Sequence, residues 1–269
     1  MRIAMAGLLE TCGQTLQISS PDSDMGALRQ SLDTQFAPSD GLVASHEPIV
    51  PQVFVSDMDS TMITAECIDE LADFAGLKDR ISAITERAMQ GELDFEEALR
   101  ERVGLLAGLP ESAIQQCLDE RIRPMAGAQI LVETLKAKGC RTVLVTGGFH
   151  HFADPVAQQL GFDEVVGNRL EVKEGMLTGG LLGPIVDSGV KKATLHSEVK
   201  AVGGEAISLA TGDGANDIPM LEAATYGIAH YAKPKAREAA NGWIDRGDLT
   251  SVLRLLGIPQ SDWVLEQAS

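Results

Sequence analysis

The sequence predicts an α/β protein with a doubly wound, Rossmann-like parallel sheet and a small helical domain inserted after its first strand. Two observations lead to this prediction. Short apolar runs, of the kind that form strands buried on both faces, alternate along the chain with segments of helical periodicity. Between the first two of these strands, residues 66–122 carry helical periodicity throughout.

The predicted elements follow one another from residue 53. The strand at 53–55 precedes the helical segment 66–122, where glycines divide the pattern into about four helices. After Pro124 come a helix at 128–138, a strand at 142–145, a helix at 156–160, a hairpin at 167–184, a helix at 191–202, strands at 207–210 and 227–231, and a closing helix at 249–256. Residues 1–50 are weakly patterned and rich in turn-forming residues, so we expect an amino-terminal extension of undefined role.

The composition restricts the class of partner. The formal net charge of −17 repels nucleic acid and anionic membranes, so any phosphate site must be built from local cations. No apolar run is long enough to cross a bilayer. The cysteines at 12, 67, 117 and 140 show no paired spacing, which favours free thiols in a reducing compartment. We expect a cytoplasmic protein that acts on a small molecule, and a homodimer is compatible with the sequence.

Polar side chains stand at the carboxyl ends of three predicted strands. Asp57 and Asp59 follow the first, Thr146 begins a Thr-Gly-Gly run at the second, and Asp213 and Asp217 follow the third. Because such ends share one edge of a parallel sheet, where ligands bind, we expect the acids to converge. Their repulsion then requires a divalent cation, and oxygen donors that leave room for a phosphate favour Mg²⁺. The alternative is a set of solvated loops with helix-capping acids.

Two cationic side chains could complete such a site. Lys191 or Lys192 precedes the third strand where a lysine could neutralise a phosphoryl group, unless the pair only begins a solvated helix. Arg102 lies on the same helical stripe as Phe95 and Leu99. It therefore either extends out of that apolar face or reaches into a cleft to bind a carboxylate.

Four motifs resemble, in order, those of the haloacid-dehalogenase (HAD) superfamily of phosphatases. They are Asp57-Met58-Asp59-Ser60-Thr61, Thr146-Gly147-Gly148-Phe149, Lys191, and Gly212-Asp213-Gly214-Ala215-Asn216-Asp217. The helical insertion is similar to the small cap of that superfamily. Segments 66–71, 89–95 and 102–106 resemble the phosphoserine phosphatase family more closely. The resemblance implies a core of residues 51–65 and 123–269 and a cap of residues 66–122.

The resemblance also implies roles for the acids and the lysine. Asp57 is expected to be the nucleophile that forms an aspartyl-phosphate, and Asp59 the acid and later the base. Mg²⁺ is expected on the carboxylates of Asp57 and Asp213 and the backbone carbonyl of Asp59, with Asp217 behind them. Lys191, chosen over its neighbour for its family spacing, is expected to hold phosphoryl oxygens.

The remaining implied roles concern the substrate. Residues at the phosphate are expected to be Thr146, Gly147 and Asn216. In the cap, Glu66 is expected to bind an ammonium group and Arg102 a carboxylate. The walls of the site are expected to include Met89 and Phe95.

The activity that the resemblance implies is Mg²⁺-dependent hydrolysis of O-phospho-L-serine to L-serine and phosphate, a step of serine biosynthesis. Two alternatives stay open. One is a phosphotransferase, or a phosphatase for another small amine such as phosphohomoserine. The other is an inert relative that binds a phosphorylated ligand without turnover.

Overall fold

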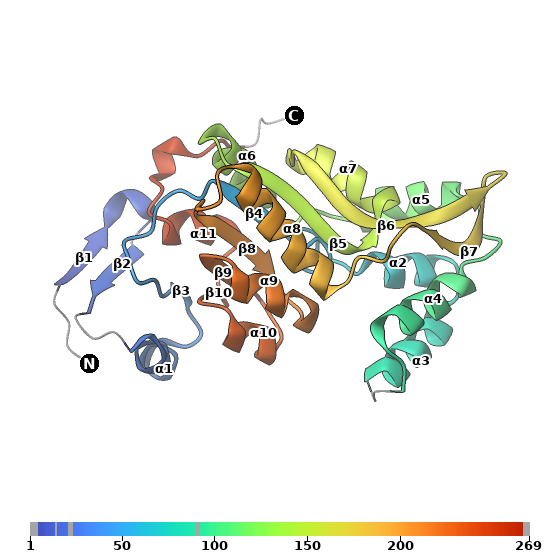
Figure 1. The fold of residues 1–269 in the computed structure, drawn as a ribbon, viewed down its shortest axis with the longest axis horizontal. Helices are drawn as coiled ribbons and strands as arrows, with labels where there is room; N and C mark the ends of the chain where they lie inside the picture. Colours follow the sequence, from blue (N-terminus) through green and yellow to red (C-terminus); the bar gives the residue numbers. More distant parts are fainter. Residues whose placement is uncertain (1–4, 14, 21–23, 90–91, 266–269) are drawn as a thin grey trace.

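An eight-stranded sheet of order β3-β10-β9-β8-β4-β5-β6-β7 runs through the protein (Figure 1). The computed structural model describes residues 5–13, 15–20, 24–89 and 92–265. Strands β10, β9, β8, β4, β5 and β6 are parallel, whereas β3 and β7 pair antiparallel at the two edges. The strand bounds are β3 Asp40–Leu42, β4 Val53–Ser56, β5 Arg141–Phe149, β6 Glu164–Lys173, β7 Met176–Leu182, β8 Ser208–Gly212, β9 Tyr226–His230 and β10 Gly242–Ile244.

Helices cover both faces of this sheet, as the alternation of strands and helices predicts. Phe54 of β4 faces the core beneath α6 (Ala128–Ala137), α7 (His150–Leu160) and α11 (Thr250–Leu255). Val53 and Val55 face a second core beneath α8 (Ser188–Ala201), α9 (Ile218–Ala223) and α10 (Pro234–Ala239). All three β4 side chains are fully buried, and each contributes about 1.5–3 kcal/mol on burial. The doubly wound α/β fold is confirmed.

Four helices form the insertion after β4. They are α2 (Cys67–Phe74), α3 (Lys78–Met89), α4 (Phe95–Leu105) and α5 (Ser112–Arg121). A reciprocal capping box begins α4: the Asp94 carboxylate accepts from Glu97 N, and the Glu97 carboxylate accepts from Asp94 N. Two chain segments connect these helices to the sheet. The two segments lie side by side and are joined by a backbone hydrogen bond from Met125 N to Met62 O at 2.8 Å.

The β6–β7 hairpin contacts the inserted helices. Gly108 N donates to Leu177 O, and Leu177 N donates to Leu109 O, both at 2.8 Å. A third backbone bond joins Glu111 N to Gly175 O at 2.8 Å. The hairpin lies beside α4 in Figure 1, so a segment that belongs to the sheet also holds the insertion from a second side.

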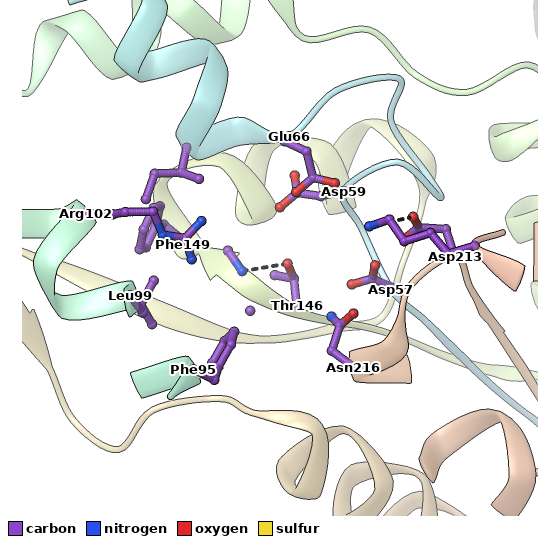
Figure 2. A pocket seen from close by; sticks show the side chains of 14 residues that line it. Asp57, Asp59, Glu66, Phe95, Leu99, Arg102, Thr146, Phe149, Asp213 and Asn216 are labelled. Atoms are coloured by element: carbon purple, nitrogen blue, oxygen red, sulfur yellow. Dashed lines mark hydrogen bonds and ion pairs between the residues drawn. The ribbon is translucent and has the colours of Figure 1, made fainter. Parts of the chain in front are cut away.

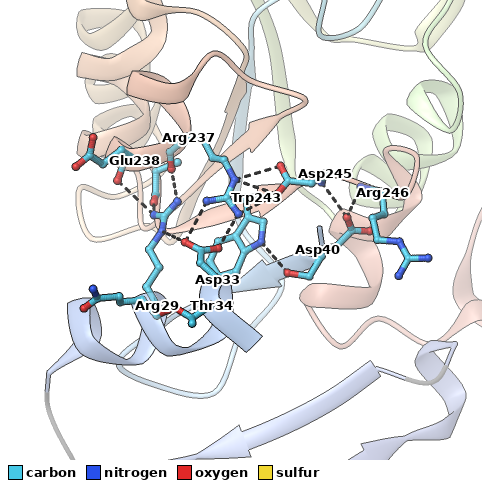
Figure 3. A network of polar contacts seen from close by, with 12 residues as sticks. Arg29, Asp33, Thr34, Asp40, Arg237, Glu238, Trp243, Asp245 and Arg246 are labelled. Carbon is cyan, nitrogen blue, oxygen red and sulfur yellow. Dashed lines mark hydrogen bonds and ion pairs between the residues drawn. The ribbon is translucent and has the colours of Figure 1, made fainter. Parts of the chain in front are cut away.

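The segment before β4 is more ordered than its sequence indicates. It forms β1 (Met5–Leu9), β2 (Thr15–Ser19), the short 3₁₀ turn η1 (Glu10–Cys12), α1 (Met25–Phe36) and the edge strand β3. Arg237 of α10 donates to both Asp33 of α1 and Asp245 (Figure 3). The guanidinium groups of Arg29 and Arg237 lie 4.9 and 5.2 Å from the ring of Trp243. This network fixes α1 to the core.

Two further 3₁₀ turns complete the described elements, η2 (Ala215–Asp217) after β8 and η3 (Gln260–Asp262) after α11. Within the described ranges, no helix has the length and apolar character needed to cross a bilayer. The four cysteines are free and buried.

Candidate active site

The acids of the first and third motifs meet because β4 lies between β5 and β8. Ser56, the last residue of β4, pairs with Leu144 on one side and Thr211 on the other. Asp57 follows, and its backbone N–H donates to Thr211 O at 3.0 Å. Carboxylate oxygens of Asp57, Asp213 and Asp217 all lie within 4.8 Å of one another. The expected convergence of these acids is thus present.

Lys191 lies at the centre of this cluster. Its Nζ donates to Asp57 Oδ1 at 2.5 Å and to Asp217 Oδ1 at 2.7 Å. The lysine and both acids have side chains no more than 5% exposed. Burial alone would lower the pKa of Lys191, but Asp57 and Asp217 outweigh it and raise that pKa. The lysine therefore stays protonated, and its neighbour Lys192 points into solvent.

Asp217 shapes the loop as well as holding the lysine. Its second oxygen, Oδ2, accepts from Asp213 N at 3.1 Å and Gly214 N at 3.0 Å. At Gly212 a Cβ atom would lie 2.5 Å from Asp217 Cγ, so this close approach requires glycine. Both oxygens of Asp217 are engaged, in keeping with its expected position behind the metal ligands.

Nearby cations do not offset the burial of Asp57 and Asp213, although Lys191 donates to Asp57 at 2.5 Å and Lys233 lies 3.9 Å from Asp213. Burial, followed by Asp217, raises the pKa of Asp57 well above its usual value in spite of Lys191. Burial raises the pKa of Asp213 to about 6. The negative charge of the clustered carboxylates exceeds the positive charge of the nearby lysines. Their oxygens are hard donors of the kind that Mg²⁺ prefers. Asp59 contributes no side-chain oxygen to this group.

Asp59 faces the cavity from the loop after β4. Its Oδ1 accepts from Cys67 N, the first N–H of α2, at 3.2 Å. Burial, followed by the nearby Glu66, raises the pKa of Asp59 to about 7. A Cβ at Gly148 would approach Asp59 Oδ2 to 3.0 Å, so the glycine at this position leaves room for the acid.

The Thr-Gly-Gly run occupies the carboxyl end of β5. Thr146 is buried, and its Oγ1 accepts from Gly148 N at 2.8 Å. The hydroxyl hydrogen therefore stays available for another acceptor. Asn168 of β6 fixes the backbone behind this run, because its Nδ2 donates to Gly147 O at 2.8 Å while its Oδ1 accepts from Val186 N at 2.9 Å.

These groups surround one cavity of about 130 Å³, which suits a small metabolite better than a nucleotide or peptide (Figure 2). Its lining residues are Asp57, Asp59, Glu66, Ile68, Phe95, Leu99, Arg102, Thr146, Gly147, Gly148, Phe149, Asp213, Asn216 and Lys233. Arg102 points into it from α4, with Nε donating to Ala98 O at 3.2 Å. None of the ion pairs among the described residues involves Arg102, and burial lowers its pKa.

Most residues expected at the site lie around this cavity. Lys191 and Asp217 do not line it, because the lysine lies beneath Asp57 and donates to Asp217 there. Met89 ends α3, and its side chain lies outside the described part of the chain. Ile68, Leu99 and Lys233 line the cavity without having been singled out for it. Lys233 could have been found, since it follows the carboxyl end of a fourth parallel strand, β9.

Comparison with known proteins agrees with this geometry. The family model for haloacid dehalogenase-like hydrolases matches residues 54–222. A phosphoserine phosphatase of Lactococcus lactis is 47% identical over 207 residues, which cover 76% of this chain and 94% of that protein. One from Haemophilus influenzae is 44% identical over 205 residues, covering 76% of this chain but only 65% of that protein.

A solved structure extends the likeness over the amino-terminal segment. The HAD family hydrolase from Salmonella enterica serovar Typhi superposes with a TM-score of 0.82 at 28% identity, covering 95% of this chain and 89% of that one. Family model, relatives and fold agree with the four motifs around the cavity. The chain therefore belongs to the haloacid dehalogenase-like hydrolases and, within them, to the phosphoserine phosphatase family.

Proposed function

We propose that this protein hydrolyses O-phospho-L-serine to L-serine and phosphate. The observation that carries the proposal is the arrangement of charges around this cavity. Asp57 and Asp59 line one part of the cavity. Glu66, directly before α2, and Arg102 of α4, which forms no ion pair with the described residues, face the same space. An ester with an ammonium group and a carboxylate beside each other matches this acid and this guanidinium.

The reaction divides between Asp57 and Asp59. A carboxylate oxygen of Asp57 attacks phosphorus, and the bond from phosphorus to the seryl oxygen breaks. Asp59 gives its proton to that departing oxygen. Asp59 then takes a proton from water as the water attacks the aspartyl-phosphate, which releases phosphate and restores Asp57. A pKa of about 7 suits an acid that gives and takes a proton near neutral pH.

The carboxylates of Asp57 and Asp213 and the backbone carbonyl of Asp59 would hold Mg²⁺. When bound, this ion neutralises charge between the acids and the phosphate and so lets a dianion approach. Lys191 keeps Asp57 in place through the 2.5 Å bond and adds a fixed positive charge below it.

The rest of the cavity would bind the substrate. Thr146, through its free hydroxyl hydrogen, the backbone of Gly147 and the side chain of Asn216 would contact phosphoryl oxygens. Glu66 would bind the ammonium and Arg102 the carboxylate. Phe95, 41% exposed, would wall the site, as would Met89.

We also propose a domain organisation and a cellular compartment. Residues 66–122 would act as the cap over a core of residues 51–65 and 123–269, with residues 1–50 as an extension. The four free thiols suit a reducing compartment such as the cytoplasm.

The decisive experiment measures phosphate release from O-phospho-L-serine with and without Mg²⁺, for the wild type and for Asp57→Asn. We expect turnover that depends on Mg²⁺ and is lost in the variant, because an amide cannot serve as the nucleophile. Turnover retained by Asp57→Asn would exclude the aspartyl-phosphate route. Adding homoserine and analysing the products separates hydrolysis from transfer, since a transferase would form phosphohomoserine.

A further inference from the structure

Ser60, directly after Asp59, has an unusual backbone conformation and an informative contact. Its φ is 55°, in the left-handed region that serine seldom adopts. Its N–H donates to Ala65 O at 3.2 Å, which closes the loop back on itself. Its hydroxyl donates to Glu66 Oε1 at 2.8 Å. The chain thus accepts a strained residue where it brings a hydroxyl to a cavity-lining acid.

Glu66 needs such a partner in order to present its carboxylate in one direction. It occupies the residue before α2 but makes no side-chain capping bond to that helix. As an exposed glutamate it has several rotamers available, and ordering them opposes ligand binding. The bond from Ser60 holds Oε1 and leaves Oε2 free to accept from a ligand. Part of the ordering is therefore complete before a ligand arrives.

The bond also joins two parts of the fold. Ser60 belongs to the loop that follows β4, whereas Glu66 directly precedes the first inserted helix, α2. The bond therefore fixes the position of the Glu66 carboxylate relative to the loop that carries Asp59. An ammonium group bound to Oε2 would then lie at a fixed distance from the reacting phosphate.

We propose that Ser60 is a positioning residue that gives this site its preference for phosphate esters with an ammonium group, by orienting Glu66. The inference rests on the proposed function. It assigns Ser60 no contact with the reacting atoms, so its effect should fall on KM for ammonium-bearing esters and leave kcat unchanged.

The test uses three esters that differ only in the groups Glu66 and Arg102 would recognise. They are O-phosphoserine, O-phosphoethanolamine, which lacks the carboxylate, and 3-phosphooxypropanoate, which lacks the ammonium. In Ser60→Ala we expect KM to rise about fivefold for the first two esters, as for loss of one exposed hydrogen bond to a charge. We expect KM for 3-phosphooxypropanoate, and kcat for all three, to stay within twofold of the wild type.

Two further variants and a control separate the hydroxyl from the backbone. Ser60→Gly relieves the left-handed strain while also removing the hydroxyl, and it should behave as Ser60→Ala does. Thr64→Ala removes an exposed hydroxyl from the same loop, whose 3.5 Å contact to Arg123 O is long, and it keeps the backbone bond from Thr64 N to Arg123 O. Its kinetics should match the wild type. In a Glu66→Ala background, which has no acceptor for the Ser60 hydroxyl, Ser60→Ala should cause no further rise in KM.

The outcomes distinguish this inference from the proposed function. A wild type that does not hydrolyse O-phosphoserine would overturn both. A wild type that hydrolyses O-phosphoserine but does not prefer ammonium-bearing esters would overturn the role of Ser60 alone. A wild type that hydrolyses O-phosphoserine, combined with equal losses on all three esters in Ser60→Ala, would overturn the role of Ser60 alone. Normal KM in Ser60→Gly would do the same, because it would show that the backbone and not the hydroxyl matters.

Discussion

Replacing Lys191 with methionine should destabilise the whole protein, because one buried cation serves two buried acids. Methionine keeps most of the aliphatic stem but removes the ammonium that lies 2.5 Å from Asp57 and 2.7 Å from Asp217. Their side chains are 5% and 0% exposed, so water cannot replace the lost charge. Breaking a buried pair in this way costs about 3–5 kcal/mol. For a chain of this size, that corresponds to a fall in Tm of about 10 °C.

Thermal unfolding and urea denaturation would measure this effect. Lys192→Met is the matched control, since its side chain is exposed and its loss should leave Tm within about 2 °C of the wild type. Adding Asp217→Asn to Lys191→Met should recover part of the loss, because it removes one of the two like charges. Equal Tm values for Lys191→Met and Lys192→Met would refute the reasoning.

Three further predictions concern pH, close packing and the amino-terminal segment. Burial lowers the pKa of His230 to about 4 from an ordinary 6.5, so the unfolded chain binds a proton at this residue first as pH falls. Between pH 7 and pH 5 this one group should lower the unfolding free energy by about 2 kcal/mol, and denaturation at both pH values should show that difference between the wild type and His230→Phe. Gly148→Ala would place a methyl group 3.0 Å from Asp59 Oδ2, and steady-state assays should find kcat about 10–100-fold lower. The control is Gly104→Ala, which should keep the wild-type kcat because its Cβ meets nothing within 4 Å. Arg237→Ala loses its bonds to Asp33 and Asp245 and should cost about 2 kcal/mol; limited proteolysis should then cut before β3 faster, and an unchanged cleavage pattern would contradict the anchoring role.

Much of the sheet is readable from the sequence because each central strand is buried on both faces. The run Val53-Phe54-Val55 has no polar residue to place in water, so only a strand between two helical layers accommodates it. The convergence of Asp57 with Asp213 then follows from topology, since parallel neighbours end at one edge. The apolar stripe marked Arg102 as unusual but left open whether it extends out of that face, and the structure points it into the cavity.

What the sequence could not supply depends on contacts between distant segments. The place of α1 is set by Arg237 and Asp33, which lie 204 positions apart, and no local periodicity reports such a pair. Lys191 was chosen by family spacing, but its position beneath Asp57 instead of in the cavity wall required the distances. Ser60 reads as one more loop hydroxyl until its bond to Glu66 is seen.

The three-residue strand β3 has a consequence for how the protein can be handled. It pairs along β10 from Gly242 to Ile244 and so closes one margin of the sheet, as β7 closes the other. A shortened protein that begins near residue 50, just before β4 and the first motif, would lack β3. The outer backbone groups of β10 would then have no partners. Exposed strands of that kind recruit strands from other molecules. The stretch with no evident chemistry thus covers the β10 edge of the sheet, and trimming it would expose the backbone groups that β3 pairs.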